Sequence, residues 1–286
     1  MPRAYQLGLY EKAMPIRLSW EEKFDALRQA GFDFLEISID ETDDKLARLD
    51  WTETEVNHLR HLIEKTQTPI VSMCLSGHRK YPLGHPDPAM QSRSLEIMEK
   101  ALQLSVKLGF RYIQLAGYDV YYENSTPETL ANFDRNLRRA VDLAAKYGVP
   151  MGFETMETAF MDTVGKAMHY VNQIKSPYLG VYPDIGNLMN ASVLYGTPYI
   201  DDLYLGRGHI LAAHLKETIP GHFREIPYGT GHTDYQAALK ACHAMGINLF
   251  VGESWDLGEE NWRELLAYAS GFLREKIDAV YLEQGY

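Results

Sequence analysis

The chain has 286 residues, of which 45% are hydrophobic, and it carries a formal net charge of −11 at pH 7. This length holds either one large α/β barrel or two ordinary domains, and the apolar content is sufficient for a sizeable core. The negative charge argues against a general affinity for nucleic acid or for an anionic membrane surface.

Two further features of the sequence indicate the compartment and the number of domains. Residues 1–6 contain no apolar signal core, and no run in the chain approaches the roughly 18 apolar residues of a membrane span. Cys74 and Cys242 lie in apolar surroundings and form no C-x-x-C pair, which is typical of reduced core thiols. We therefore expect a cytoplasmic protein. Because no Ser/Gly-rich linker interrupts the sequence, we expect one domain over residues 1–286.

Short apolar runs alternate with segments of helical periodicity along the whole chain. The expected strands, in chain order, are residues 6–10, 34–39, 70–76, 112–117, 151–154, 181–184, 211–214 and 250–253. The expected helices are residues 19–30, 53–65, 90–108, 127–147, 164–173, a short helix before Gly206, 235–244 and 260–279. Ser19, with Glu22 three residues later, and Thr52 are expected to cap the first two helices. Residues 77–88 and 217–233 are expected to be long loops, and residues 186–198 a connection.

The strands are continuous apolar runs rather than alternations of period two, which is typical of a parallel sheet covered on its outer face. Eight strand–helix units of this length predict a (β/α)8 TIM barrel rather than a doubly wound sheet. Residues 229–231 read Gly-Thr-Gly and do not complete a dinucleotide-binding fingerprint. In such a barrel we expect the active site at the C-terminal mouth of the strands.

Four polar residues end four successive expected strands: Glu154, Asp184, His214 and Glu253. Each is separated from the next by about one strand-plus-helix unit, so all four should point at the same mouth. A buried carboxylate is costly unless a cation or hydrogen bonds neutralise it. Any one of these acids could be a helix cap or a salt-bridge partner. Together they predict a site for one divalent cation such as Mn²⁺, Zn²⁺, Co²⁺ or Mg²⁺.

A loop with cations and glycines follows the His214 strand. Lys216 and Arg224 supply positive charge, while Gly229 and Gly231 leave backbone N–H groups open to an anion. Barrel enzymes often bind a substrate phosphate around their last loops, so this loop is a candidate phosphate site. The alternative is a solvated loop whose charges bind nothing.

Other candidates have both a functional and a structural interpretation. His78 and Arg79 follow the third expected strand and form a second possible phosphate site. Glu36 belongs to the second strand and is expected to bond either a substrate hydroxyl or another residue inside the barrel. Asn187 could orient the substrate, and Glu157 could support the metal site or lie in solvent.

These residues and their surroundings resemble a known family. The segments that carry the resemblance are LGLYEKA at residues 7–13, DETDD at 40–44, RLDW at 48–51, SMCLS at 72–76, QLAGYDVYY at 114–122, YPDIGN at 182–187 and HLKETIPG at 214–221. The chain resembles the xylose-isomerase-like barrel superfamily, which includes endonuclease IV, the ketose 3-epimerases and hydroxypyruvate isomerase. Within it, the sequence is most similar to the L-ribulose-5-phosphate 3-epimerase family of L-ascorbate and pentose breakdown.

The resemblance implies a divalent metal on Glu154, Asp184, His214 and Glu253, with the two glutamates doubling as the acid/base pair. Free-sugar ketose 3-epimerases typically carry histidine where this chain has Asn187, which points towards the phosphosugar branch. The implied substrate is a small phosphorylated sugar, and barrels of this kind commonly form homodimers.

The expected reaction is epimerisation at C3 of a ketopentose 5-phosphate, with one base on each face of a planar enediolate. Glu154 and Glu253 would be these bases. The alternative is an aldose–ketose isomerase, which shuttles the proton between C1 and C2 with the same metal. A metal-dependent nuclease of the endonuclease IV type would need further metal ligands and a basic DNA-binding face, and the charge of −11 counts against it.

Overall fold

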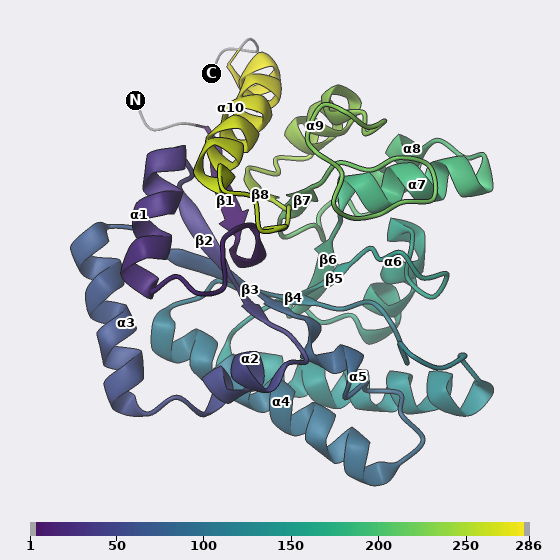
Figure 1. The fold of residues 1–286 in the computed structure, drawn as a ribbon. Coiled ribbons are helices and arrows are strands. Elements are labelled where there is room, and N and C mark those ends of the chain that lie inside the picture. The colour runs from purple at the N-terminus through teal and green to yellow at the C-terminus, as the bar shows by residue number, and fades with distance from the viewer. Residues whose placement is uncertain (1–3, 283–286) are drawn as a thin grey trace.

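Eight parallel strands form the wall of a nearly closed barrel (Figure 1). The structure, a computed structural model, describes residues 4–282. The strands are β1 (Gln6–Tyr10), β2 (Phe34–Ile39), β3 (Ile70–Leu75), β4 (Tyr112–Leu115), β5 (Met151–Glu154), β6 (Leu179–Tyr182), β7 (Ala213–Leu215) and β8 (Leu249–Gly252). In the sheet they follow the order β6-β5-β4-β3-β2-β1-β8-β7, and isolated bridges of Val181 with Ile210 and of Asp184 with His214 bring β6 to β7. The predicted (β/α)8 barrel is confirmed.

Helices surround this barrel on its outside (Figure 1). They are α1 (Trp20–Ala30), α2 (Asp43–Ala47), α3 (Glu53–Thr66), α4 (Pro88–Leu108), α5 (Pro127–Tyr147), α6 (Val164–Ile174), α7 (Ile185–Tyr195), α8 (Tyr199–Leu205), α9 (Tyr235–Ala244) and α10 (Trp262–Tyr281). Three short 3₁₀ turns follow strands or helices: η1 (Glu11–Ala13), η2 (Arg48–Asp50) and η3 (Ser76–Arg79).

The predicted capping residues act as caps. The Ser19 hydroxyl accepts the N–H of Glu22, whose carboxylate accepts the Ser19 N–H in return, and Thr52 forms the same box with Glu55. Gly31 ends α1 in the left-handed region, at a φ of 89°, where a side chain would be strained. These local signals explain why the first helices begin and end where the sequence predicts.

Two helices lie where the sequence predicts irregular chain. The α2 helix occupies part of the polar segment after β2, and α7 occupies most of the expected connection at residues 186–198. Asp184 causes the second difference, because its side chain is the N-cap of α7: Oδ1 accepts the N–H of Asn187 at 2.8 Å. The helix-cap role that the sequence left open for each of the strand-end acids is thus filled by Asp184, while the helix that it caps was not predicted.

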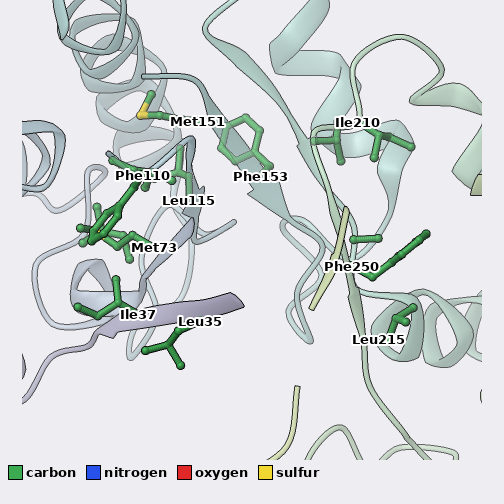
Figure 2. Packing of buried hydrophobic residues seen from close by; sticks show 14 of the residues in the cluster. Leu35, Ile37, Met73, Phe110, Leu115, Met151, Phe153, Ile210, Leu215 and Phe250 are labelled. Atoms are coloured by element: carbon green, nitrogen blue, oxygen red, sulfur yellow. The ribbon is translucent and has the colours of Figure 1, made fainter. Parts of the chain in front are cut away.

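The core has two layers. Side chains such as Leu35, Ile37 and Phe153 point outward from the strands and pack under the helices (Figure 2). A smaller apolar cluster, which includes Phe34 and Tyr182, fills the inside of the barrel. Because side chains alternate along a strand, the inner face of β2 also carries a carboxylate, and this places a polar group beneath the mouth.

The last helix closes the ring against the first. The Arg274 guanidinium on α10 donates to the carbonyl of Gly31 at 2.6 Å and to Asp33 at 2.9 Å. In residues 4–282 no helix combines the length and the apolar character needed to cross a membrane. Residues 1–3, which belong to the segment without an apolar signal core, lie outside the described residues.

Candidate active site

Four ligand-type side chains meet at the mouth of the barrel. Glu154 is the last residue of β5, Asp184 lies two residues after β6, His214 lies within β7, and Glu253 directly follows β8. All four are buried, and one ligand atom from each lies within 4.8 Å of those of the other three. The parallel strands therefore bring together the four residues that the sequence singles out.

The arrangement around His214 fits a hard divalent cation. The His214 Nδ1 lies 2.9 Å from Glu253 Oε2, 3.5 Å from Glu154 Oε1 and 4.0 Å from Asp184 Oδ2. Burial raises the pKa of Asp184 well above its ordinary value and also raises that of Glu154, and the neighbouring Glu253 carboxylate adds to both effects. A cation among these oxygens would reverse that cost. Three carboxylates and one imidazole match the preferences of Mn²⁺, Co²⁺, Zn²⁺ and Mg²⁺.

Lys216 lies inside this group rather than on the surface of its loop. Its side chain is buried, and its Nζ is 2.9 Å from Asp184 Oδ2 and 3.6 Å from Glu253 Oε2. The contact with Asp184 is an ion pair without hydrogen-bond geometry, so Asp184 Oδ2 has no hydrogen bond among the described residues. Although burial would lower the pKa of Lys216, Asp184 and Glu253 raise it above its ordinary value.

The Glu217 carboxylate lies against the Gly229–Gly231 segment. The buried Glu217 carboxylate accepts the N–H groups of Gly229 at 2.9 Å and of Thr233 at 3.1 Å. A Cβ on Gly231 would come within 2.5 Å of Glu217 Oε1, so the glycine allows the loop to close on this carboxylate. The N–H of Gly229, one of the two glycines predicted to face a phosphate, is therefore bonded to Glu217.

His78 and Arg79 point to different places. The buried His78 ring lies against α4, with Nε2 at 3.1 Å from the carbonyl oxygen of Ser94, and burial lowers its pKa to about 4. The Arg79 guanidinium instead stacks on the Tyr121 ring at 4.6 Å, and its Nε is buried without a hydrogen-bond partner in the described structure. His78 is thus turned away from Arg79 and towards the helix layer.

Arg224 shares the surroundings of Arg79. Its Nη2 donates to Glu157 Oε1, which also accepts the Tyr121 hydroxyl at 3.1 Å. Burial and repulsion from Arg79 lower the pKa of Arg224, but Glu157 and Tyr121 hold it above its ordinary value. We call Arg79, Tyr121, Glu157 and Arg224 the arginine cluster. It contains two guanidinium groups for one carboxylate, so one positive charge is in excess.

Asn187 lies between the ends of β5 and β6. Its Nδ2 donates to the carbonyl of Thr155 at 2.8 Å, while its Oδ1 is buried without a hydrogen-bond partner in residues 4–282. It also lines a cavity of about 300 Å³ together with Glu157 and Asn190. The side chain therefore holds the strand ends and has one acceptor available.

Aromatic side chains line the other side of the mouth. The Trp255 ring lies 5.8 Å from Lys216 Nζ, and it borders an apolar cavity of about 150 Å³ that reaches Glu253. The Tyr10 ring packs 6.2 Å from that of His214, between centroids. Both residues thus border the mouth with an aromatic ring.

Glu36 and Gln114 lie beneath the four ligands. The fully buried Glu36 places Oε1 2.6 Å from His214 Nε2, and Gln114 Nε2 lies 3.3 Å from His214 Nδ1. Gln114 and Glu217 were not among the sequence candidates. Each lies in a segment that carried the resemblance. Neither ends a strand, so a search for polar residues at strand ends does not find them.

The fold and the buried group of ligands define a xylose isomerase-like TIM barrel, and the profile of that family matches residues 24–276. A probable L-ribulose-5-phosphate 3-epimerase UlaE from Mycoplasma pneumoniae is 44% identical over 237 residues, which are 83% of this chain and 76% of that protein. The L-ribulose-5-phosphate 3-epimerase UlaE of Salmonella paratyphi A is 38% identical over 272 residues, which are 95% of this chain and 94% of that protein. The chain belongs to the L-ribulose-5-phosphate 3-epimerase family, which consists of enzymes of the isomerase class, and the resemblance predicted from the sequence is confirmed. Among solved structures, a D-tagatose 3-epimerase-like protein has the same fold, with a TM-score of 0.80 at 16% identity over 98% of this chain and all of that one.

Proposed function

We propose that this chain is a metal-dependent 3-epimerase that interconverts L-ribulose 5-phosphate and L-xylulose 5-phosphate. The observation that carries the proposal is the meeting of Glu154 and Glu253 with Asp184 and His214, with ligand atoms within 4.8 Å of one another. The names of relatives that are 38% and 44% identical support the choice of substrate. The paired glutamates support a proton-transfer reaction.

The proton on C3 lies α to the C2 ketone and is only weakly acidic in water. A divalent cation held by these four residues would act as a Lewis acid and make the C3 proton more acidic. Glu154 arrives from β5 and Glu253 from β8, so the two carboxylates approach the substrate from different strands. One takes the C3 proton, and the other gives a proton to the opposite face of the planar enediolate. Asp184 and His214 take no part in the proton transfer.

The arginine cluster is the proposed phosphate site. Arg79 has no carboxylate partner in the described residues, and Arg224 shares Glu157 with Tyr121, so an anion would complete the charge balance. Glu157 lies three residues after Glu154, which limits the distance between their Cα atoms to about 10 Å. A 5-phosphate four bonds from C3 is compatible with that span. Lys216, in contact with Asp184, serves the reacting end of the substrate instead.

Proton exchange with solvent tests the reaction class. Epimerisation of L-ribulose 5-phosphate in D₂O is expected to place deuterium at C3 of the product and none at C1, as read by proton NMR. Deuterium at C1 would instead identify an aldose–ketose isomerase.

Two single variants test the pair of bases. Glu154→Gln and Glu253→Gln each remove one base while keeping an oxygen able to bind metal. Each is expected to abolish net epimerisation and to exchange the C3 proton of only one epimer, with opposite preferences in the two variants. Epimerisation at near wild-type rates in either variant would rule out the two-base mechanism.

A further inference from the structure

We infer that Glu36 is the residue that positions His214 for metal binding, and this inference rests on the proposed metal site. The Glu36 side chain is fully buried and has no exposed atom for a substrate. Its Oε1 lies 2.6 Å from His214 Nε2. Because a carboxylate only accepts hydrogen bonds, Nε2 is the nitrogen that donates to Glu36, and Nδ1 is the nitrogen that faces the other three ligand residues.

Two hydroxyl groups fix the Glu36 carboxylate itself. Ser72 Oγ donates to Glu36 Oε2 at 2.6 Å, and the Tyr182 hydroxyl donates to the same oxygen at 2.9 Å. The donors come from β3 and β6, so the carboxylate is held across the inside of the barrel. One oxygen is thus reserved for these hydroxyls and the other for His214.

The direction of the His214 ring follows from this arrangement. With Nε2 held by Glu36, Nδ1 points towards Glu253 at 2.9 Å and Glu154 at 3.5 Å, the side on which the carboxylates gather. A carboxylate behind a metal-binding histidine fixes the orientation of the ring and raises the basicity of the ligand nitrogen. Loss of such a partner typically lowers metal affinity by about 10- to 100-fold.

The test measures the affinity of Zn²⁺ by competition with a chelating indicator, using the full-length protein after removal of metal. Glu36→Gln is expected to lower the affinity about 10- to 100-fold. Because Glu36 does not touch substrate, excess Zn²⁺ should restore the turnover of this variant with little change in KM. In the Zn²⁺-loaded wild type, the imidazole proton on His214 Nε2 should appear far downfield in the NMR spectrum, and it should move upfield in Glu36→Gln.

Asp119→Asn provides a matched control. Asp119 is also fully buried and accepts two hydroxyl groups, from Ser125 at 2.7 Å and Thr129 at 2.5 Å, but it has no contact with His214. This variant should keep the wild-type affinity for Zn²⁺. If Glu36→Gln does not fold, Ser72→Ala takes its place, because it removes one of the two donors and should weaken Zn²⁺ binding by a smaller factor.

The outcomes separate this inference from the proposed function. An unchanged Zn²⁺ affinity and an unmoved His214 signal in Glu36→Gln, or unchanged affinity in Ser72→Ala if that variant must be used, would overturn the role of Glu36. An equal loss in Asp119→Asn would overturn it too, because the loss would then reflect general destabilisation. If His214→Ala binds Zn²⁺ as well as the wild type does, the proposed metal site itself is wrong.

Discussion

Arg79 and Arg224 are the single residues on which the choice of a phosphorylated substrate depends. A charge-assisted contact of this kind contributes about 1.5–3 kcal/mol, so Arg79→Ala and Arg224→Ala should each lower kcat/KM for L-ribulose 5-phosphate by roughly 10- to 150-fold. The kcat/KM for unphosphorylated L-ribulose should hardly change. Arg207→Ala is the control, because the exposed Arg207 also stacks on a tyrosine, with its guanidinium 5.4 Å from the Tyr204 ring. Equal losses on both sugars would contradict the phosphate assignment.

Two glycine-to-alanine variants, one in the loop and one in α10, test how tightly the loop packs on Glu217. A Cβ at Gly231 would lie 2.1 Å from the carbonyl oxygen of Thr218, so Gly231→Ala should destabilise the protein by about 1–3 kcal/mol. Gly271 lies within α10, and a Cβ there would meet no atom within 4 Å, so Gly271→Ala should stabilise the protein by about 1 kcal/mol. Thermal unfolding of the two variants should shift in opposite directions. Shifts of the same sign would mean that the loop is not packed as described.

At the scale of elements, one buried carboxylate joins the first strand to the helices around it. Glu11 in η1 contacts Lys23 of α1 at 2.6 Å, Lys45 of α2 at 2.7 Å and Arg48 of η2 at 2.6 Å. It also accepts the N–H of Ser38 from β2 at 2.9 Å. Burial alone would raise the pKa of Glu11, but Arg48, Lys45 and Lys23 lower it well below its ordinary value. Three cations therefore depend on one negative charge.

Neutralising Glu11 should loosen this whole corner of the barrel. Glu11→Gln leaves buried cations unpaired and should cost about 3–5 kcal/mol in the free energy of unfolding, measured with urea. Glu53→Gln, which breaks the exposed pair with Lys107, should leave the free energy of unfolding almost unchanged, because solvent screens that pair. Because the folded-state pKa of Glu11 is depressed, its contribution is complete above the unfolded pKa of about 4.3 and is lost as pH falls below it. A stability difference between wild type and Glu11→Gln that does not shrink in acid would contradict this account.

The positions of elements could be predicted from the sequence better than the directions of side chains. Capping at Ser19 and Thr52 is set by neighbouring residues, and the meeting of Glu154 with Glu253 follows from the geometry of parallel strands. The direction of Lys216 towards Asp184 depends on a residue 32 positions away, and no local pattern reports it. The hydrogen bonds of the loop N–H groups to Glu217 and the contact of His78 with the Ser94 carbonyl could not be predicted for the same reason.

At the scale of the whole molecule, the proposed cation would link β6 to β7, the neighbouring strands that are joined only by isolated bridges among the described residues. Its four ligands come from β5 to β8, and the bridges between β6 and β7 are isolated ones. Mn²⁺ at 100 times its Kd should raise the free energy of unfolding by about 2.7 kcal/mol, and a chelator should reverse the effect. Hydrogen exchange should slow most in β6 and β7. A shift of the same size in His214→Ala would show that Mn²⁺ stabilises the barrel from another site.

Asp184 divides its two oxygens between two tasks, and this division has a practical consequence. Oδ1 caps α7 through the N–H of Asn187, while Oδ2 faces the other ligands. Asparagine caps a helix about as well as aspartate, but its neutral amide oxygen binds a divalent ion more weakly than a carboxylate does. Asp184→Asn should therefore keep the fold while losing catalytic activity. Such a variant could be crystallised with an unconverted sugar phosphate in the mouth.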